Sequence, residues 1–172
     1  MPNYRRAVVK GGTFFFTLTT YRRIPVRTEP DVRIALRQAI QTVRASHPFE
    51  IDACVLLPDH LHSIWTLPEG DADYSMRRAK IKMLVSKECG TRFGARELTD
   101  SRAKRHESGL WQRRFWEHQI RDDDDFSRHV DYIHWNPVNT VSLPGLAIGS
   151  TRRFIAMCAV ARIRRIGDWR NH

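Results

Sequence analysis

A histidine pair is the feature of the sequence that points most directly to chemistry. His60 and His62 flank Leu61 in a segment with the alternation of a β-strand, and side chains at i and i+2 of a strand project from one face. Two neutral imidazoles on one face can bind a divalent metal ion, while Leu61 packs on the opposite face. The pair alone is weak evidence for a metal site, because a third ligand is needed.

A predicted helix that begins with the aspartate run 122–125 offers further polar groups. Tyr132 and Asn136 lie at i and i+4 on one edge, with Arg128 one turn earlier, so this edge presents a phenol, an amide and a cation. A half-buried tyrosine and an asparagine that ends the helix would explain both residues without any chemistry. The aspartates fit the positive end of the helix dipole better than an acidic metal site. The apolar stripe that should face a sheet consists of Phe126, Val130, Ile133 and Pro137.

The elements that must position these residues follow from hydrophobic periodicity and turn signals. A tight turn at Pro58 and Asp59 joins two strands, and residues 90–109 lack a clear period and are predicted to form a basic loop. The order βαββαβα predicts an α+β fold of the ferredoxin-like kind, an antiparallel sheet with the helices packed on one face. We expect strands over 13–21, 49–57, 60–67 and 111–120, and helices over 29–46, 73–89 and 122–135.

An excess of positive charge is the second functional signal. The chain of 172 residues suits one domain and carries 29 Lys and Arg against 19 Asp and Glu, a net charge of +10. This balance favours a polyanionic partner, nucleic acid above all. A solvated helix face followed by a basic loop is the alternative explanation. Candidate phosphate contacts are Arg77, Arg78, Lys80, Lys82, Lys87, Arg113 and Arg114, and candidate base-stacking residues, each of which could equally be core, are Trp111, Trp116 and Trp135.

Several classes of protein are excluded by composition. No apolar stretch approaches the ~20 residues that cross a bilayer, and no apolar run follows the N-terminal arginines, so we expect a cytoplasmic protein that is not bound to membranes. Cys54, Cys89 and Cys158 are too widely spaced for a disulfide framework or a thiolate zinc site.

The chain resembles the REP-associated tyrosine transposases, bacterial members of the single-tyrosine HUH transposase family, in the strings LLPDHLHSIWTLPEGDADYS and GLWQRRFWEHQIRDDDDFSRHVDYIHWNPV. The resemblance begins with PNYRRA and GGTFFFT near the start. It implies that His60 and His62 bind a divalent ion, Mg²⁺ or Mn²⁺, with Asn136 as the third ligand. It also implies that Tyr132 is the nucleophile. His118 and His129 fit the pattern too, and His118 either supports the ligands, relays a proton or is purely structural.

The leading hypothesis is therefore a metal-dependent single-strand DNA endonuclease and strand transferase. The family acts on single-stranded DNA beside hairpins formed by REP palindromes, through a 5′-phosphotyrosine. A hairpin-binding module without productive cleavage is the alternative. A phosphohydrolase whose histidine pair activates water is disfavoured, because Tyr132 and Asn136 would be idle and no carboxylates are spaced to bridge metals.

The resemblance ends after Val138, which divides the chain into a transposase domain over 1–138 and a basic tail over 139–172. A permissible set of codons for 150–170, read in another frame, yields DSSFHRYVRSGAYPPDWG, which looks like the family's tail. We infer a frameshift here and expect the tail as written not to pack. Deleting it should leave the melting temperature nearly unchanged, whereas restoring the frame should raise it; unfolding on deletion would contradict the frameshift.

Overall fold

The central strand of the sheet is apolar on both faces. In β1 (Thr13–Thr19), Phe14 and Phe16 point to one face and Phe15 points to the other, and all three are buried. Such a strand needs a helical layer on each side, because a bare face would leave large aromatic rings in water.

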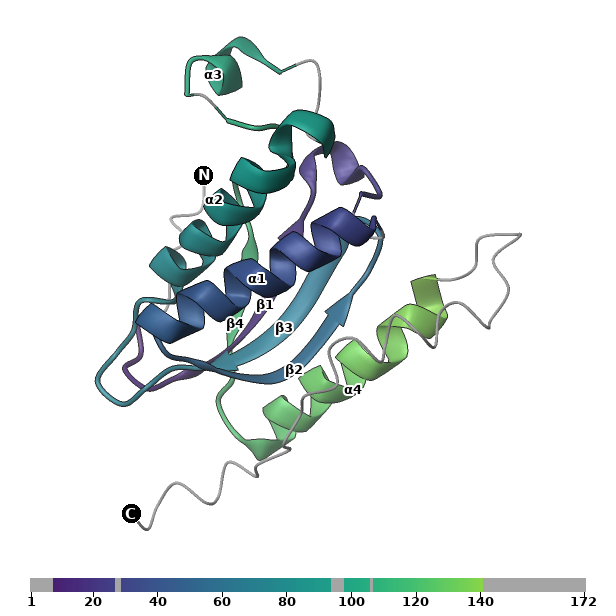
Figure 1. The fold of residues 1–172 in the computed structure, drawn as a ribbon. Helices are drawn as coiled ribbons and strands as arrows, with labels where there is room; N and C mark the ends of the chain where they lie inside the picture. Colours follow the sequence, from purple (N-terminus) through teal and green to yellow (C-terminus); the bar gives the residue numbers. More distant parts are fainter. Residues whose placement is uncertain (1–7, 27–28, 94–97, 106, 141–172) are drawn as a thin grey trace.

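The computed structural model describes residues 8–26, 29–93, 98–105 and 107–140 (Figure 1). Its strands form one antiparallel sheet in the order β2-β3-β1-β4, with β3 antiparallel to both β1 and β2. The predicted α+β class and the βαββαβα order are confirmed, with one short helix, α3, added. The remaining strands are β2 (Glu50–Leu56), β3 (His60–Thr66) and β4 (Trp116–Gln119), and the helices are α1 (Pro30–Ser46), α2 (Tyr74–Phe93), α3 (Asp100–Ala103) and α4 (Asp123–Thr140).

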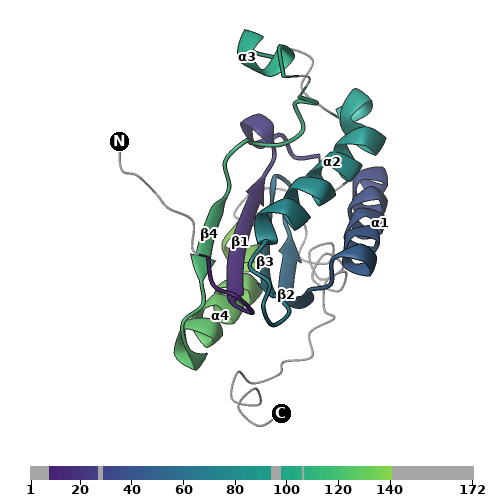
Figure 2. The ribbon, with the colours of Figure 1, turned by 90° about the vertical axis from the view of Figure 1, so that its left-hand side faces the viewer.

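Helices α1 and α2 cover one face of the sheet. α1 has Pro30 in its first turn, as expected, and buries one stripe against Phe14 and Phe16 of β1. Figure 2 shows both helices on the same side of the strands. The buried apolar residues of α1 are Val32, Ala35, Leu36, Ala39 and Val43.

Helix α4 lies on the opposite face, so the prediction that the helices pack on one face is wrong for this helix. Phe126 and Ile133 of the predicted stripe pack against Phe15 and Ile64, in a second core that α1 and α2 do not share (Figure 2). The physical reason is the apolar character of both faces of β1 and β3. As a result, α4 covers the face from which His60 and His62 project.

Several boundaries also differ from those predicted. α4 continues to Thr140, so Asn136 lies inside the helix, because the preceding turns are held on the sheet and Pro137 removes only one helical hydrogen bond. α2 continues to Phe93, and the predicted loop 90–109 contains α3. Of the predicted strand 111–120, only β4 is a strand, with an isolated bridge at Trp111.

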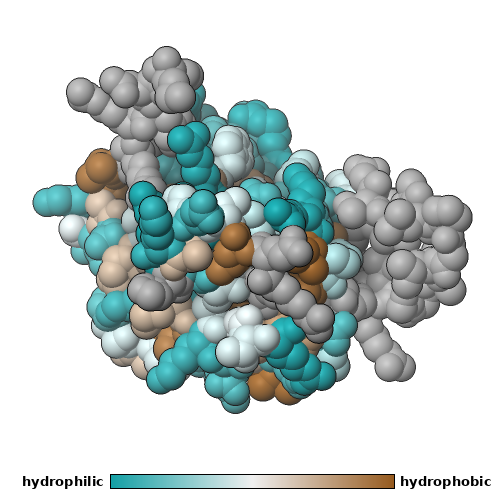
Figure 3. Space-filling model, turned by 90° about the horizontal axis from the view of Figure 1, so that it is seen from above, coloured by the Kyte–Doolittle hydropathy of each residue, from teal (hydrophilic) through white to brown (hydrophobic). Residues whose placement is uncertain are grey.

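The surface agrees with the strongly charged composition. Figure 3 shows an end of the molecule covered mainly by hydrophilic side chains, with apolar ones scattered between them. Among the described helices, none has both the length and the apolar character needed to span a bilayer. The tail predicted from residue 139 lies outside the described residues, apart from the last two residues of α4.

Candidate active site

The histidine pair lies at the start of β3, directly after the tight turn at Pro58 and Asp59. Leu61 faces the α1 and α2 layer, whereas the rings of His60 and His62 lie together on the α4 side with centroids 4.7 Å apart. The predicted turn, and the prediction that the two imidazoles share a face, are confirmed. The hairpin thus presents both rings at one end of the sheet.

Both imidazoles are held through Nδ1. The His60 Nδ1 atom donates to Asp59 Oδ1 at 2.6 Å, and His62 Nδ1 donates to Thr17 Oγ1 at 2.9 Å. Burial alone would raise the pKa of the Asp59 carboxyl, but hydrogen bonds and charge from His60 and Arg23 hold this pKa below its ordinary value. Asp59 is therefore a carboxylate that accepts a hydrogen bond from His60 Nδ1. This arrangement is typical of histidines that bind a metal through Nε2.

Helix α4 brings Tyr132 and Asn136 to the same pair of rings. The Tyr132 ring centroid lies 5.1 Å from that of His62, and Asn136 Nδ2 donates to His62 Nε2 at 3.3 Å. Because Nε2 accepts this bond, the proton of His62 is on Nδ1, which is the tautomer that binds a metal through Nε2. Tyr132 is half exposed, at 50%. Four residues singled out in the sequence thus meet at one place.

A cavity of about 1100 Å³ opens over these residues. Its walls come from β1 and the short turn after it, β3, the segment before β4, the start of β4, and α4. Its lining includes the four residues just described, the cations Arg114 and Arg128, and the aromatic rings of Phe15 and Trp116. A phenol, imidazoles, amides and arginine cations around an open cavity suit chemistry on a phosphate ester.

Comparison with known proteins gives the family. No protein-family model matches the chain. The chain is 44% identical over 138 residues to the REP-associated tyrosine transposase of Escherichia coli (strain K12), an alignment that covers 80% of this chain and 73% of that protein. The chain belongs to the REP-associated tyrosine transposases.

Two further relatives agree with this assignment. A member of the same family from Haemophilus influenzae is 42% identical over 142 residues, which cover 80% of this chain and 77% of the relative. A solved structure of a REP-associated tyrosine transposase bound to a REP hairpin matches with a TM-score of 0.68 at 44% identity, over 82% of this chain and 75% of that one. The resemblance seen in the sequence is confirmed, and the protein is a transposase.

Two of the predicted phosphate contacts of this transposase are buried. Arg77 and Arg78 are only 1% and 3% exposed. Arg77 donates to the main-chain oxygens of His47 and Pro48 and pairs with Asp71 at 2.6 Å. Arg78 packs over the rings of two phenylalanines. The guanidinium of Arg77 is thus bonded within the protein, whereas Arg78, although buried, also lines the second cavity described below.

The helical period of α2 indicates that Arg77 and Arg78 are buried, whereas the number of basic residues does not. Arg77 and Arg78 fall on the same face of α2 as Tyr74, Ile81 and Val85, all of which are buried. A basic residue on the apolar stripe of a helix is expected to stabilise the fold. Its aliphatic stem packs in the core, and its charged group can be buried there when it has hydrogen-bond or ion-pair partners.

We expect Arg77→Met to destabilise the fold. The change leaves main-chain oxygens and the Asp71 carboxylate without their donor, at a cost of about 2–4 kcal/mol in the free energy of unfolding. Urea denaturation measures it. Lys87→Met, at an exposed position on the same helix, is the control and should change stability by less than about 0.5 kcal/mol. Equal stability of the two variants would show that the Arg77 bonds contribute nothing.

The other predicted contacts of the transposase lie nearer the surface. Lys80 Nζ lies 3.1 Å from His47 Nε2, and Lys82 donates to the main-chain oxygen of Gln112 at 2.6 Å. Lys87, Arg113 and Arg114 are exposed. Lys82, Lys87 and Arg113 line a second cavity of about 830 Å³, and Arg114 lines the active-site cavity. Gln112 and Phe115 line both, so the two cavities adjoin.

The three candidate base-stacking tryptophans also differ in burial. Trp111 is buried in the core, whereas Trp116 is exposed and lines the active-site cavity. Trp135 is also exposed, on α4. Of these three candidates, Trp116 is the one placed to meet a base inside the active-site cavity.

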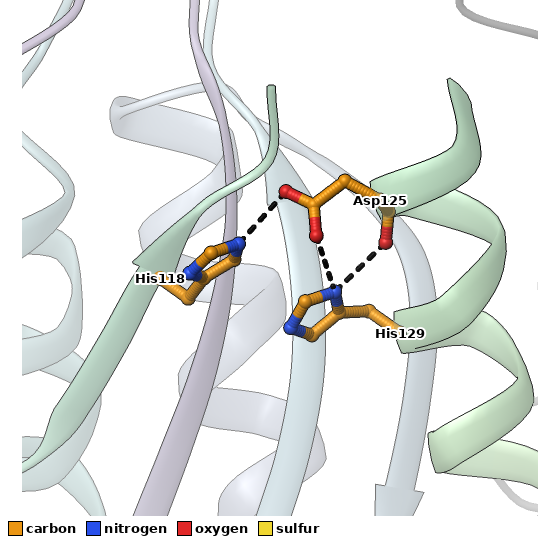
Figure 4. Close-up of side chains that lie close together, drawn as sticks. All are labelled: His118, Asp125 and His129. Atoms are coloured by element: carbon orange, nitrogen blue, oxygen red, sulfur yellow. Dashed lines mark hydrogen bonds and ion pairs between the residues drawn. The ribbon is translucent and has the colours of Figure 1, made fainter. Parts of the chain in front are cut away.

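A cluster that the sequence analysis did not assemble lies beside this site. His118 of β4 and His129 of α4 both contact Asp125, whose carboxylate lies between them (Figure 4). Their ligand atoms lie within 4.8 Å of one another, close enough for a metal ion. In the sequence, the helix dipole is an adequate explanation of Asp125, and His118 is the histidine predicted to support the ligands. The available signal was the i, i+4 spacing of Asp125 and His129.

Proposed function

We propose that this transposase cleaves and rejoins single-stranded DNA at REP-type hairpins, with Tyr132 as the nucleophile and with His60, His62 and Asn136 as ligands of Mg²⁺ or Mn²⁺. The observation that carries the proposal is the half-exposed Tyr132 at the mouth of a cavity, 5.1 Å from the ring of His62, which Asn136 also contacts. A relative of the chain was solved with a REP hairpin bound, which supports the choice of substrate.

The donor set fits a divalent ion. Both histidines are oriented through Nδ1, and an amide at Asn136 reaches His62 Nε2, so rotation of that amide would present its oxygen to the same point. A bound ion supplies Lewis-acid stabilisation of the charge on the scissile phosphate. The residues of the chain then have to hold the DNA and deliver the attacking oxygen.

Tyr132 performs the covalent step. Its Oη forms a bond to phosphorus as the bond from phosphorus to the 3′ oxygen breaks, and the electron pair leaves with the 3′ oxygen, which takes a proton. The product is a 5′-phosphotyrosine and a free 3′-hydroxyl. The energy of the phosphodiester is kept in the protein–DNA bond, so a 3′-hydroxyl can attack it and rejoin the strand without ATP.

The two adjoining cavities offer a path for the DNA. Positive charge lines both cavities along the way to Tyr132. It comes from Lys87 and Arg113 at one cavity and from Arg114 at the other, and it can bind the phosphates of the DNA strand. Trp116 is 53% exposed at the active-site cavity and is suited to stack on an unpaired base.

Arg114→Ala should weaken hairpin binding and lower its salt dependence. Loss of one phosphate contact reduces the slope of log K against log salt by about 1. The measurement is a set of binding isotherms for single-stranded REP-type DNA at several salt concentrations. Arg37→Ala is the matched control, because Arg37 is an exposed residue of α1, on the other face of the sheet. Identical slopes for both variants would show that Arg114 does not contact the DNA phosphates.

The function itself is tested by covalent capture. Labelled single-stranded DNA that carries a REP-type hairpin is incubated with the protein and Mn²⁺, and the products are separated under denaturing conditions. A labelled protein band supports the proposal. Tight binding without such a band would instead indicate a hairpin-binding protein, and cleaved DNA without a band would indicate hydrolysis by water.

A further inference from the structure

The hydrogen bonds of the Asp125 cluster fix which nitrogen atoms carry protons. His129 Nδ1 lies 2.8 Å from the main-chain oxygen of Asp125 and 3.3 Å from its Oδ1. A carbonyl oxygen only accepts hydrogen bonds, so Nδ1 carries the proton and Nε2 carries the lone pair in the neutral ring. Figure 4 shows that the second ring nitrogen of His129 lies on the side away from Asp125.

The carboxylate of Asp125 is a hydrogen-bond acceptor for several groups. It accepts from His118 Nε2 at 2.8 Å and from the main-chain N–H of Arg121 at 3.1 Å. Burial alone would raise the pKa of this carboxyl, but these hydrogen bonds and the two histidines hold the pKa below its ordinary value. The nitrogen atoms that face Asp125 therefore donate hydrogen bonds to it, which favours an orienting role for Asp125 over a metal site.

His129 lies next to the proposed nucleophile. It precedes Tyr132 by three residues on α4, a spacing that makes side chains neighbours. Both rings pack against Phe15, at centroid distances of 4.9 Å for His129 and 5.9 Å for Tyr132, and both residues line the same cavity. The other charged or titratable groups around His129 are Asp125 and Arg128 on α4, His118 on β4, and His62 on β3 beyond Phe15.

We propose that His129 exchanges a proton with the Tyr132 hydroxyl and that Asp125 is the positioning residue that orients the His129 ring. This proposal rests on Tyr132 as the nucleophile. A phenol keeps its proton at neutral pH and attacks phosphorus poorly unless a base removes that proton. An imidazole whose Nδ1–H is held by the main-chain oxygen and the carboxylate of Asp125, and whose Nε2 carries the lone pair, is such a base.

The proton of Tyr132 moves together with the bonds at phosphorus. As Oη bonds to phosphorus, its proton passes to His129 Nε2, and the 3′ oxygen leaves with the electron pair and takes a proton from water. During rejoining the imidazolium returns its proton to Oη as the phenol leaves, and the attacking 3′-hydroxyl gives its proton to water. His129 ends each cycle in its starting state.

The test is single-turnover formation of the covalent adduct by His129→Ala. We expect the rate to fall by about 10²–10⁴-fold, the usual contribution of a general base, while hairpin affinity stays within about twofold of wild type. Added imidazole should restore much of the rate to His129→Ala, because the vacated space can hold the missing base. His134→Ala is the matched control, since His134 is an exposed histidine of the same helix that does not line the cavity; it should react at the wild-type rate.

Two results would overturn the proton-transfer role. One is a His129→Ala protein that reacts at the wild-type rate, and the other is a slow His129→Ala protein that imidazole does not rescue. If the alanine variant does not fold, His129→Gln takes its place, because its amide can still donate to the Asp125 main-chain oxygen but is not a base. Failure of the wild-type protein to form any adduct would instead overturn the proposed function, and this proposal with it.

Discussion

Replacement of Tyr132 by phenylalanine should abolish covalent capture of DNA, with a fall in the rate on the order of 10⁴-fold or more, as expected when a nucleophile is removed. The change deletes only the attacking oxygen. The ring can keep its edge contacts with His62 and Phe15, so the helix and the cavity should be unaffected. Denaturing electrophoresis of labelled DNA with Mn²⁺ measures adduct formation, and binding isotherms should show nearly unchanged hairpin affinity.

The control for this experiment is Tyr21→Phe. Tyr21 is a half-buried tyrosine in the short turn after β1, where its ring packs under the guanidinium of Arg102, and it does not line the active-site cavity. Its adduct yield should equal that of wild type. A Tyr132→Phe protein that still became covalently attached to DNA would mean that another side chain is the nucleophile.

Much of the site follows from two local periods in the sequence. Alternation along β3 places His60 and His62 together and Leu61 opposite, and the helical period of α4 places Tyr132 and Asn136 on one edge. Both relations are local, so they can be derived before any tertiary structure is known. The meeting of the two groups is not local, because it depends on which face of the sheet α4 covers.

The face covered by α4 was predicted wrongly for a definite reason. An apolar stripe shows that a helix packs on a sheet but does not say on which side. The relevant signal was in β1, where Phe14, Phe15 and Phe16 form an unbroken apolar run that is typical of a strand buried on both faces. This run predicts a second helical layer.

Charge is a poorer guide to position than periodicity in this chain. The net charge of +10 agrees with a family of DNA transposases. Two of the candidate phosphate contacts, however, are arginines buried on α2. The Asp125 cluster was missed for a related reason. A run of aspartates at a helix start is adequately explained by the dipole, and only the strand pairing that brings His118 alongside reveals the separate role of the last aspartate.

Replacement of either His60 or His62 by alanine should abolish cleavage and weaken Mn²⁺ binding. Loss of a residue that orients a ligand typically costs about 10–100-fold, so loss of a ligand itself should cost more than about 100-fold. Adduct formation and Mn²⁺ titration followed by calorimetry give the two readouts. Thr17→Val, which removes the acceptor of His62 Nδ1, should fall within the smaller range.

Folding has to be separated from metal binding in these variants, because His62 is buried between Thr17 and Asn136. His62→Gln keeps a polar side chain of similar length and serves as the second variant, with melting temperature as the check. His134→Ala, on the exposed side of α4, is the control and should retain wild-type activity and Mn²⁺ affinity.

Asn136→Ala should be milder than either histidine change, since water can take a vacated oxygen position around Mg²⁺ or Mn²⁺. A double His60 and His62 variant that folds and still forms the adduct in Mn²⁺ would contradict the metal site, and the role of the histidine pair would then have to be sought in binding the DNA phosphate directly.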